Sequence, residues 1–321
     1  MPTIDQLQAA RAIVYGAMEP TPQRRWPLLD SRLGREVWVK HENLTPLGAF
    51  KVRGGLVHMR LRKERGETNG VITASTGNHG QSIPYAARRE GIAATVVVPV
   101  GNSPAKNAAM RALGAELIEH GHDFSAAREF AEDLAKERRL SMVPSFHDEL
   151  VLGVSSYACE LFEAAGDLDT VYVPIGMGSG ICGVIAARDA LGLKTEVVGV
   201  VAEGAEAYAL SFAAREPVAT NRVQTFAEGL AVRVPHPDAV AAINAGAARV
   251  VKVSDAEMAE AMRVLFGTTR TVAEGAGAAG LAALMGESCG SPGARVGVVL
   301  SGGNIDPARF ATVLGGGIPA V

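Results

Sequence analysis

A lysine set among glycines and apolar residues is the first candidate for chemistry in this sequence. Lys51 follows Phe50 in the stretch GAFKVRGG, residues 48–55. Lysines normally lie on solvated faces, so Lys51 and Arg53 could be ordinary surface charges at the edge of a loop. The amine of a buried lysine has a lowered pKa and can act as a nucleophile or a base. The stretch therefore predicts a reactive amine, with two surface charges as the alternative.

Three glycine-rich turns offer sites for an anion. They follow apolar runs and read TGNHGQS at 76–82, GMGSGICG at 176–183 and SGGNID at 301–306. A strand, a glycine turn and a helix start leave backbone N–H groups unpaired, and such groups bind anions. Glycine lets the backbone approach the anion closely. The turns therefore predict a phosphate cradle, and plain tight turns of an α/β fold are the alternative.

The lysine and the turns together match the needs of pyridoxal 5'-phosphate. This cofactor requires a Schiff-base lysine, an anion site for its phosphate and a partner for its pyridine nitrogen. Lys51 supplies the amine, the turns supply the anion site, and Asn78 or Ser301 could hold the ring. Because each feature is weak alone, their joint presence at predicted strand ends carries the prediction.

The second turn also has a different interpretation. Gly178, Gly180 and Gly183 spell G-x-G-x-x-G, and Glu203 lies twenty residues after the last of them. This pattern is typical of dinucleotide sites, in which the acid binds the ribose. A nicotinamide-dependent oxidoreductase is therefore the rival hypothesis from a different class of enzyme.

The elements that must position these residues alternate along the chain. Runs rich in Val and Ile predict strands at 36–42, 70–75, 94–100, 115–121, 170–176, 196–203 and 294–303. The spacing of apolar residues predicts helices at 103–114, 124–139 and 255–269, and another near the N-terminus. This alternation predicts an α/β protein with two doubly wound domains and mainly parallel sheets. In such folds the ligand lies at the carboxyl ends of the strands.

The composition is that of a globular enzyme acting on a small molecule. The 321 residues are 48% hydrophobic and 20% charged, with a net charge of -3 and no basic run, so we expect no nucleic-acid partner. No signal peptide or membrane span is evident, which predicts a cytoplasmic protein without a membrane partner. Cys159, Cys182 and Cys289 are scattered and odd in number, which argues against a disulfide framework or a zinc site and favours core positions.

The motifs resemble those of the fold-type II pyridoxal phosphate enzymes, specifically the threonine/serine dehydratase and serine racemase group. The resemblance covers nearly the whole chain, in the order TP, KHENLTPLGAFKVRGG, STGNHGQS, GMGSGICG and SGGN. It implies a larger cofactor-binding domain formed by 1–47 and 148–321 and a smaller, mobile α/β domain at 48–147. The cofactor would lie in the cleft between them, and the protein would be a homodimer.

The resemblance also implies roles for single residues. Lys51 would hold the cofactor covalently and then move the Cα proton, with Phe50 beside it. Asn78 would bind the 3'-oxygen of the cofactor, Ser301 would face its pyridine nitrogen, and Glu274 would form a wall of the site. The residues expected to cradle the phosphate are Gly176, Met177, Gly178, Ser179 and Gly180. Those expected to bind the substrate carboxylate are Ser75, Thr76, Gly77 and His79, with structural packing as the alternative for His79.

The chain departs from the family pattern at several positions. Met177 and Ser179 interrupt a run of glycines in the phosphate loop. Thr76 stands where racemases carry a serine, so we expect Thr76 and Lys51 to be catalytic and dehydration to be favoured over racemisation. Glu203 matches one acid of a racemase cation site, but Ala209 stands in place of the second, so we expect no metal.

The implied activity is a dehydratase, or ammonia-lyase, acting on a β-hydroxy-α-amino acid such as L-threonine or L-serine. β-Elimination would give a 2-oxo acid and ammonia. A serine at the pyridine nitrogen makes the cofactor a weaker electron sink, which suits elimination. The alternatives are a dehydratase for a bulkier substrate of the phenylserine or hydroxyaspartate type, a serine racemase, a β-replacement synthase, a non-catalytic relative and the oxidoreductase.

Overall fold

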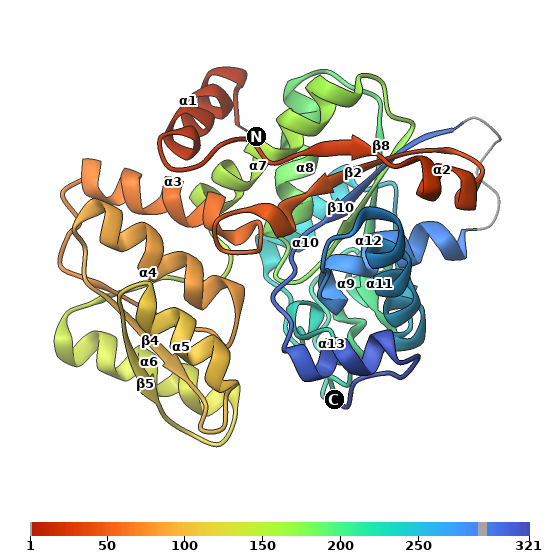
Figure 1. Ribbon diagram of the computed structural model, residues 1–321. Helices are drawn as coiled ribbons and strands as arrows, with labels where there is room; N and C mark the ends of the chain where they lie inside the picture. Colours follow the sequence, from red (N-terminus) through yellow and green to blue (C-terminus); the bar gives the residue numbers. More distant parts are fainter. Residues whose placement is uncertain (1, 288–293) are drawn as a thin grey trace.

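Two sheets, one of six strands and one of four, organise the described part of the chain. Figure 1 shows their arrangement. The computed structural model describes residues 2–287 and 294–321. The larger sheet has the order β1-β2-β10-β7-β8-β9, and the smaller sheet has the order β5-β4-β3-β6. All paired strands run parallel except β1 and β2. The predicted α/β class with mainly parallel sheets is therefore confirmed.

Most of the strands form where the apolar runs predicted them. The larger sheet contains β1 (Gln23–Arg25), β2 (Glu36–His41), β7 (Thr170–Pro174), β8 (Glu196–Ala202), β9 (Arg249–Val253) and β10 (Arg295–Leu300). The smaller sheet contains β3 (Val71–Ala74), β4 (Ala94–Val98), β5 (Ala115–Glu119) and β6 (Ser141–Met142). β3 and β4 are buried along their whole length, which explains their uninterrupted apolar character. The sequence did not predict β1 and β6, which are very short, or β9, which is only partly buried.

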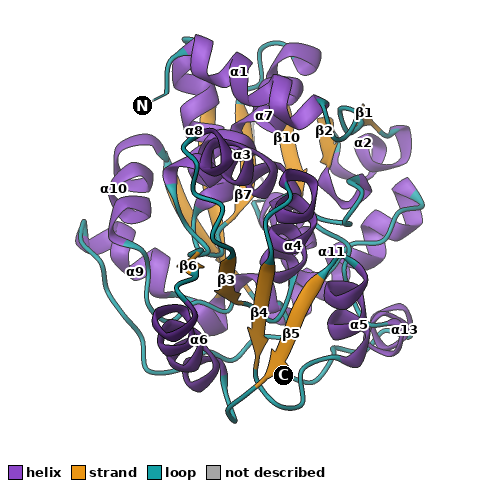
Figure 2. Cartoon of the chain, turned by 90° about the vertical axis from the view of Figure 1, so that its left-hand side faces the viewer, coloured by secondary structure: helices purple, strands orange, loops and turns teal. Residues whose placement is uncertain are grey.

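Helices cover both faces of each sheet (Figure 2). On the larger sheet α11 (Asp255–Thr269) and α12 (Gly275–Gly286) pack on one face, and α7 (Asp148–Ala165) and α8 (Ser179–Ala190) pack on the other. On the smaller sheet α6 (Phe124–Arg138) packs on one face, opposite α4 (Asn78–Glu90) and α5 (Pro104–Ala112). The remaining helices are α1 (Ile4–Tyr15), α2 (Pro27–Leu33), α3 (Lys51–Glu64), α9 (Ala207–Ala214), α10 (Pro237–Gly246) and α13 (Pro307–Leu314), with three short 3-10 turns, η1 (Glu42–Leu44), η2 (Glu203–Ala205) and η3 (Glu228–Leu230).

Helix α3 lies between two halves of the molecule, the larger half around the six-stranded sheet and the smaller half around the four-stranded sheet. It contacts α7 of the larger half on one side and α4 of the smaller half on the other (Figure 1). A Cβ atom added at Gly54 would lie 2.8 Å from the Leu150 carbonyl oxygen on α7. A Cβ atom added at Gly153 of α7 would lie 2.4 Å from the carbonyl oxygen of Arg53, and one at Gly55 would lie 2.3 Å from Ser82 Oγ on α4. Only glycine permits backbones to approach this closely.

A fully buried ion cluster fastens α3 to the larger sheet. Arg53 is 0% exposed, and it donates from Nε to Glu42 at 2.7 Å and from Nη1 to Glu160 of α7 at 2.6 Å. Lys40 of β2 donates to the same Glu160 and to the Thr21 carbonyl oxygen at 2.7 Å. The alternative that Arg53 is a surface charge is therefore wrong, because its guanidinium is needed to neutralise two buried carboxylates.

The cysteines and the helix lengths complete the fold. Cys159 and Cys182 are buried free thiols, as expected of core residues, and Cys289 lies outside the described residues. Within the described part of the chain, none of the helices combines the length and the apolar character that a membrane crossing requires. The domain boundaries at 47–48 and 147–148 remain a prediction.

Candidate active site

Lys51 is the first residue of α3, and its side chain points toward the start of α8. Its Nζ donates a hydrogen bond to Ser179 Oγ at 3.0 Å and lies 5.1 Å from the centre of the Phe50 ring. Burial lowers the pKa of Lys51 to about 8. A large fraction of the amine is therefore neutral near pH 8, which a solvated surface lysine does not achieve. The alternative of a surface charge is wrong for Lys51 as well.

The loop at 176–180 forms a cradle of backbone at the start of α8. Gly178 has a φ of 100°, a left-handed conformation that favours glycine, and it precedes the first residue of the helix, Ser179. A Cβ atom at Gly178 would lie 2.7 Å from Ala239 Cβ, and one at Gly176 would lie 2.3 Å from the Gly229 carbonyl oxygen. Among the described residues, the N-cap of α8 makes no side-chain hydrogen bond, so the first N–H groups of this helix are available to an anion.

Met177 does not fill the cradle. Its side chain is partly buried and packs against the hydrophobic core around α7 and α8. Its carbonyl oxygen accepts a hydrogen bond from the Tyr208 hydroxyl at 2.8 Å, which holds the loop in place. The departure from an all-glycine loop is therefore accommodated by turning the side chain into the core.

Phe50 is held between the loop at 176–180 and the end of β10. Its ring packs edge-on against Tyr157 at 6.2 Å between centroids, and the Tyr157 hydroxyl donates to the Gly180 carbonyl oxygen at 3.1 Å. The Phe50 backbone N–H donates to the carbonyl oxygen of Ser301 at 3.0 Å. Ser301 is itself only 7% exposed. Residues far apart in the sequence are therefore joined around the first turn of α3.

Asn78 and Glu274 form a hydrogen-bonded pair beside this group. Asn78, the first residue of α4, donates from Nδ2 to Glu274 Oε1 at 2.8 Å, and its Oδ1 accepts from Asn304 at 2.7 Å. Burial raises the pKa of Glu274 to about 7, although the hydrogen bond from Asn78 acts in the opposite direction. The role of Asn304 was not predicted, although its motif SGGN was noticed.

The loop before α4 combines an ordered turn with a buried histidine. Ser75 is 8% exposed, and its Oγ accepts from the backbone N–H of Gly80 at 3.0 Å. Thr76 and Gly77 are half-buried, and among the described residues the Thr76 hydroxyl makes no hydrogen bond. Burial, reinforced by Lys51, lowers the pKa of His79 to about 3, and the ring also interacts with the Val143 carbonyl. His79 is therefore neutral at physiological pH.

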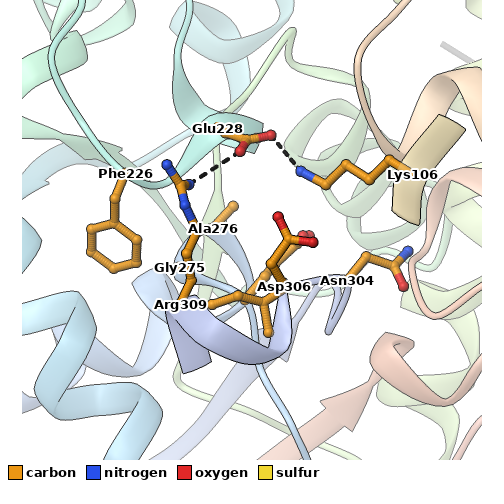
Figure 3. A pocket seen from close by; sticks show the side chains of 11 residues that line it. Lys106, Phe226, Glu228, Gly275, Ala276, Asn304, Asp306 and Arg309 are labelled. Carbon is orange, nitrogen blue, oxygen red and sulfur yellow. Dashed lines mark hydrogen bonds and ion pairs between the residues drawn. The ribbon is translucent and has the colours of Figure 1, made fainter. Parts of the chain in front are cut away.

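A pocket opens next to Glu274 (Figure 3). Lys106 of α5 and Arg309 of α13 both pair with Glu228, which connects the smaller sheet's layer to the larger half. Asp306, at the start of α13, also lines the pocket and accepts from Ser103 on the far side at 3.2 Å. The sequence alone did not predict the two cations, because neither belongs to a recognisable motif.

The group fits pyridoxal phosphate by three independent observations. The backbone at Gly176 and Gly178 leaves room that a side chain would fill, directly at a helix N-terminus. Lys51 presents an amine whose pKa is lowered beside it. His79 Nε2 is buried without a hydrogen-bond partner among the described residues, as expected where a ligand group is to be received.

The comparisons with known proteins agree with this chemistry. The family model described as pyridoxal-phosphate dependent enzyme matches residues 14–302. The biosynthetic L-threonine dehydratase of Escherichia coli (strain K12) is 33% identical over 299 residues, 92% of this chain and 58% of that protein. An L-threo-3-hydroxyaspartate ammonia-lyase from a Pseudomonas species is 32% identical over 313 residues, 97% of this chain and 98% of its own length.

A solved structure has the same fold over almost the whole chain. The processed form of threonine deaminase isoform 2 from Solanum lycopersicum matches with a TM-score of 0.90 at 26% identity. The match covers 98% of this chain and 94% of that chain. The alternative of a nicotinamide-dependent oxidoreductase, which rested on the G-x-G-x-x-G spacing, is therefore wrong. The chain belongs to the pyridoxal-phosphate dependent enzyme family.

Proposed function

We propose that the protein is an ammonia-lyase that removes the β-hydroxyl group and the amino group of a β-hydroxy-α-amino acid, giving a 2-oxo acid and ammonia. The observation that carries the proposal is the Lys51 amine, 3.0 Å from Ser179 Oγ at the open N-terminus of α8. An amine with a lowered pKa beside an anion cradle is the arrangement that a phosphate-bearing aldehyde cofactor requires.

Lys51 holds the cofactor and moves the substrate proton, and the loop at 176–180 binds the cofactor phosphate. Pyridoxal phosphate, when bound, supplies an electron-withdrawing ring that makes the substrate's Cα–H bond acidic. Lys51 holds the cofactor and accepts the Cα proton at Nζ, which its pKa of about 8 allows near neutral pH. The phosphate is bound by backbone N–H groups of Gly176, Met177, Gly178, Ser179 and Gly180, with the Ser179 hydroxyl as a further donor.

The remaining site residues orient the ring and the substrate. Asn78 is supported as a ring ligand by its place at the start of α4, where Glu274 and Asn304 hold its amide in one orientation. Glu274 forms the wall next to it. Ser301 would face the pyridine nitrogen of the bound cofactor and, as a hydroxyl, would not force that nitrogen to carry a proton.

The turn before α4 binds the substrate carboxylate. The residues are Ser75, Thr76, Gly77 and His79. The N-cap of the helix that follows is Gly77, which has no side chain, and Ser75 Oγ accepts the N–H of the third helical residue, Gly80. The N–H groups of Asn78 and His79 are therefore directed at an anion. Thr76, whose hydroxyl is uncommitted, lies on this turn as the second catalytic residue. His79 is neutral and presents its free Nε2, so it contributes a hydrogen bond rather than a charge.

L-threonine or L-serine is the first substrate to expect. A second candidate is L-threo-3-hydroxyaspartate, favoured by the Pseudomonas relative, which matches along 98% of its length, whereas the E. coli relative is matched along only 58%. Lys106 and Arg309 line the pocket beside Glu274, but both pair with Glu228, so they would bind a second substrate carboxylate only in competition with that residue.

The assembly and cellular location are part of the same proposal. We expect a homodimer in the cytoplasm, in which the segment 48–147 moves relative to the rest as the site opens and closes. The buried free thiols Cys159 and Cys182 suit a reducing compartment. Light scattering coupled to size exclusion measures the oligomer, and a mass of one chain, 33.3 kDa, would contradict the dimer.

A substrate panel tests the activity. The purified enzyme, loaded with pyridoxal phosphate, is incubated with L-threonine, L-serine and L-threo-3-hydroxyaspartate, and the 2-oxo acid and the ammonia released are measured. The two products should form in equal amounts. We expect turnover of at least one of the three, and none in Lys51→Ala. Chiral analysis of recovered L-serine is the control for racemisation. Racemisation without 2-oxo acid, or an unchanged rate in the Lys51 variant, would contradict the proposal.

A further inference from the structure

A cluster of two histidines and one carboxylate lies outside the site described above. His58 belongs to α3, His147 immediately precedes α7, and Glu149 lies in the first turn of α7. One ligand atom from each lies within 4.8 Å of the other two. The cluster therefore joins the helix that begins with Lys51 to the chain segment that enters the larger half.

The geometry points to a binding site for a divalent transition metal, and we propose that His58, His147 and Glu149 bind Zn²⁺ or a chemically similar ion, with water as a fourth ligand. His58 Nδ1 lies 2.6 Å and His147 Nδ1 lies 3.9 Å from Glu149 Oε2. With zinc bonds of about 2.0 to 2.1 Å, tetrahedral donors lie about 3.3 Å apart. Small side-chain rotations bring these atoms to that spacing.

The types of donor select the metal. Two imidazoles and one carboxylate suit Zn²⁺, Co²⁺, Ni²⁺ and Fe²⁺, whereas Mg²⁺ and Ca²⁺ prefer oxygen donors throughout. Binding at His58 Nδ1 requires the ring to carry its proton on Nε2 instead of donating it to Glu149. His147 now accepts the N–H of Glu149 at 3.2 Å, a long hydrogen bond that a metal replaces easily.

The surroundings make the site accessible and tune its strength. The side chain of His58 is 4% exposed and that of His147 is 43% exposed, so one ligand is rigid and the other is open to solvent. Two cations face the cluster: Arg65 pairs with the other oxygen of Glu149, and Arg62 lies close enough to His58 to oppose its positive charge. These cations weaken metal binding, because they compete for the carboxylate and repel a dication.

Metal binding would strengthen the junction between α3 and α7. An ion that binds only the folded protein stabilises it by mass action, by about 2.7 kcal/mol at one hundred times its Kd. The ligands form no local motif, because His58 and His147 lie 89 positions apart, so the sequence alone did not indicate the site. The sequence-based expectation of no metal considered a different place, near Glu203.

Cobalt binding to the holoenzyme tests the proposal, because tetrahedral Co²⁺ absorbs visible light and Zn²⁺ displaces it. We compare the wild-type enzyme with His147→Gln and with a matched control, His122→Gln, whose histidine is 89% exposed and outside the cluster. Since loss of a supporting group alone weakens metal sites by about 10- to 100-fold, loss of a ligand is expected to weaken binding at least about 100-fold. The wild type and the control should each bind one equivalent and gain thermal stability with Zn²⁺.

Two further results sharpen the outcome. Arg65→Gln should bind Co²⁺ more tightly than the wild type, because it removes a cation that competes for Glu149. Cofactor absorbance is recorded in every variant, so binding to the cofactor itself is recognised as a signal that His147→Gln does not change. No cobalt band in the wild type, or equal affinity in His147→Gln and the wild type, would overturn the proposal.

Discussion

Lys51 and Arg53 lie two positions apart on one helix and have opposite electrostatic surroundings. Arg53 meets two buried carboxylates, Glu42 and Glu160, at 2.6 to 2.7 Å. Lys51 meets a hydroxyl, an aromatic ring and no carboxylate within 4 Å among the described residues. Arg53 is fully buried and paired, whereas Lys51 is half-buried and has no countercharge among the described residues.

The difference appears in the proton affinities. Burial opposes the charge on Glu160, but Arg53 and Lys40 outweigh burial and keep its pKa below the usual value. Nothing comparable offsets burial at Lys51, where the pKa falls to about 8, or at Glu274, where it rises to about 7. Paired charges stabilise the fold. The pKa values of the unpaired groups lie close to pH 7, where a group can both accept and release a proton.

The largest effect is expected from removing the unpaired amine. Lys51→Ala should lower kcat/KM at least about 10,000-fold, or about 5 kcal/mol, because both covalent attachment and proton transfer are lost. Its free energy of unfolding should change by less than about 1 kcal/mol, because no ion pair is broken. Ammonia release and urea denaturation measure the two quantities. An unfolded variant would contradict the contrast with Arg53.

Removing Arg53 from the buried ion cluster should lower the free energy of unfolding. Arg53→Met leaves Glu42 and Glu160 buried without their main partner, which costs about 3 to 5 kcal/mol in free energy of unfolding. The matched control is Arg60→Met on the same helix, whose side chain is 46% exposed and pairs only at the surface. That change should cost less than about 1 kcal/mol. Equal losses in the two variants would show that burial of the pair does not matter.

A smaller, pH-dependent effect is expected at Glu274. Its pKa is raised in the folded protein, so the folded state holds a proton that the unfolded state releases between pH 4.5 and about 7. The stability contributed by this group is therefore present at low pH and lost as the pH rises through about 7. Glu274→Gln should stabilise the cofactor-free protein by about 1 to 3 kcal/mol at pH 8 and leave it unchanged at pH 4. Urea titrations at the two pH values measure this, and a loss of stability at pH 8 would contradict it.

The smallest effect on stability is expected at the partly exposed ion pair between Lys106 and Glu228. Lys106 is 14% exposed in its side chain and Glu228 is 46% exposed, so their ion pair is strongly screened by water. Lys106→Met should change the free energy of unfolding by less than about 1 kcal/mol. Arg111→Met, which loses a surface pair on the same helix, is the control. A loss in free energy of unfolding close to that of Arg53→Met would contradict this and show that Lys106 stabilises the fold as the buried ion cluster does.

The sequence predicted the chemistry of the site better than its contacts. Lys51, the glycine turns and the parallel strands could be predicted because each depends on local residue types. The pairing of Asn78 with Glu274, 196 positions apart, could not, because it depends on how two helix starts meet. Arg53 was taken as a possible surface charge for the same reason: its partners Glu42 and Glu160 are separated from it by 11 and 107 positions.

The glycine contacts on both sides of α3 have a mechanical consequence. Gly54 places its backbone against the backbone of Leu150 on α7, and Gly55 places its backbone against Ser82 of α4, whose Oγ donates to the Lys51 carbonyl oxygen at 2.6 Å. If the segment 48–147 rotates relative to the rest of the chain, as proposed above, the axis of that rotation would lie along α3. Lys51, the first residue of α3, would be displaced little by such a rotation. If the roles and the movement of 48–147 proposed above hold, the residue that holds the cofactor would move less than the residues that bind the substrate carboxylate.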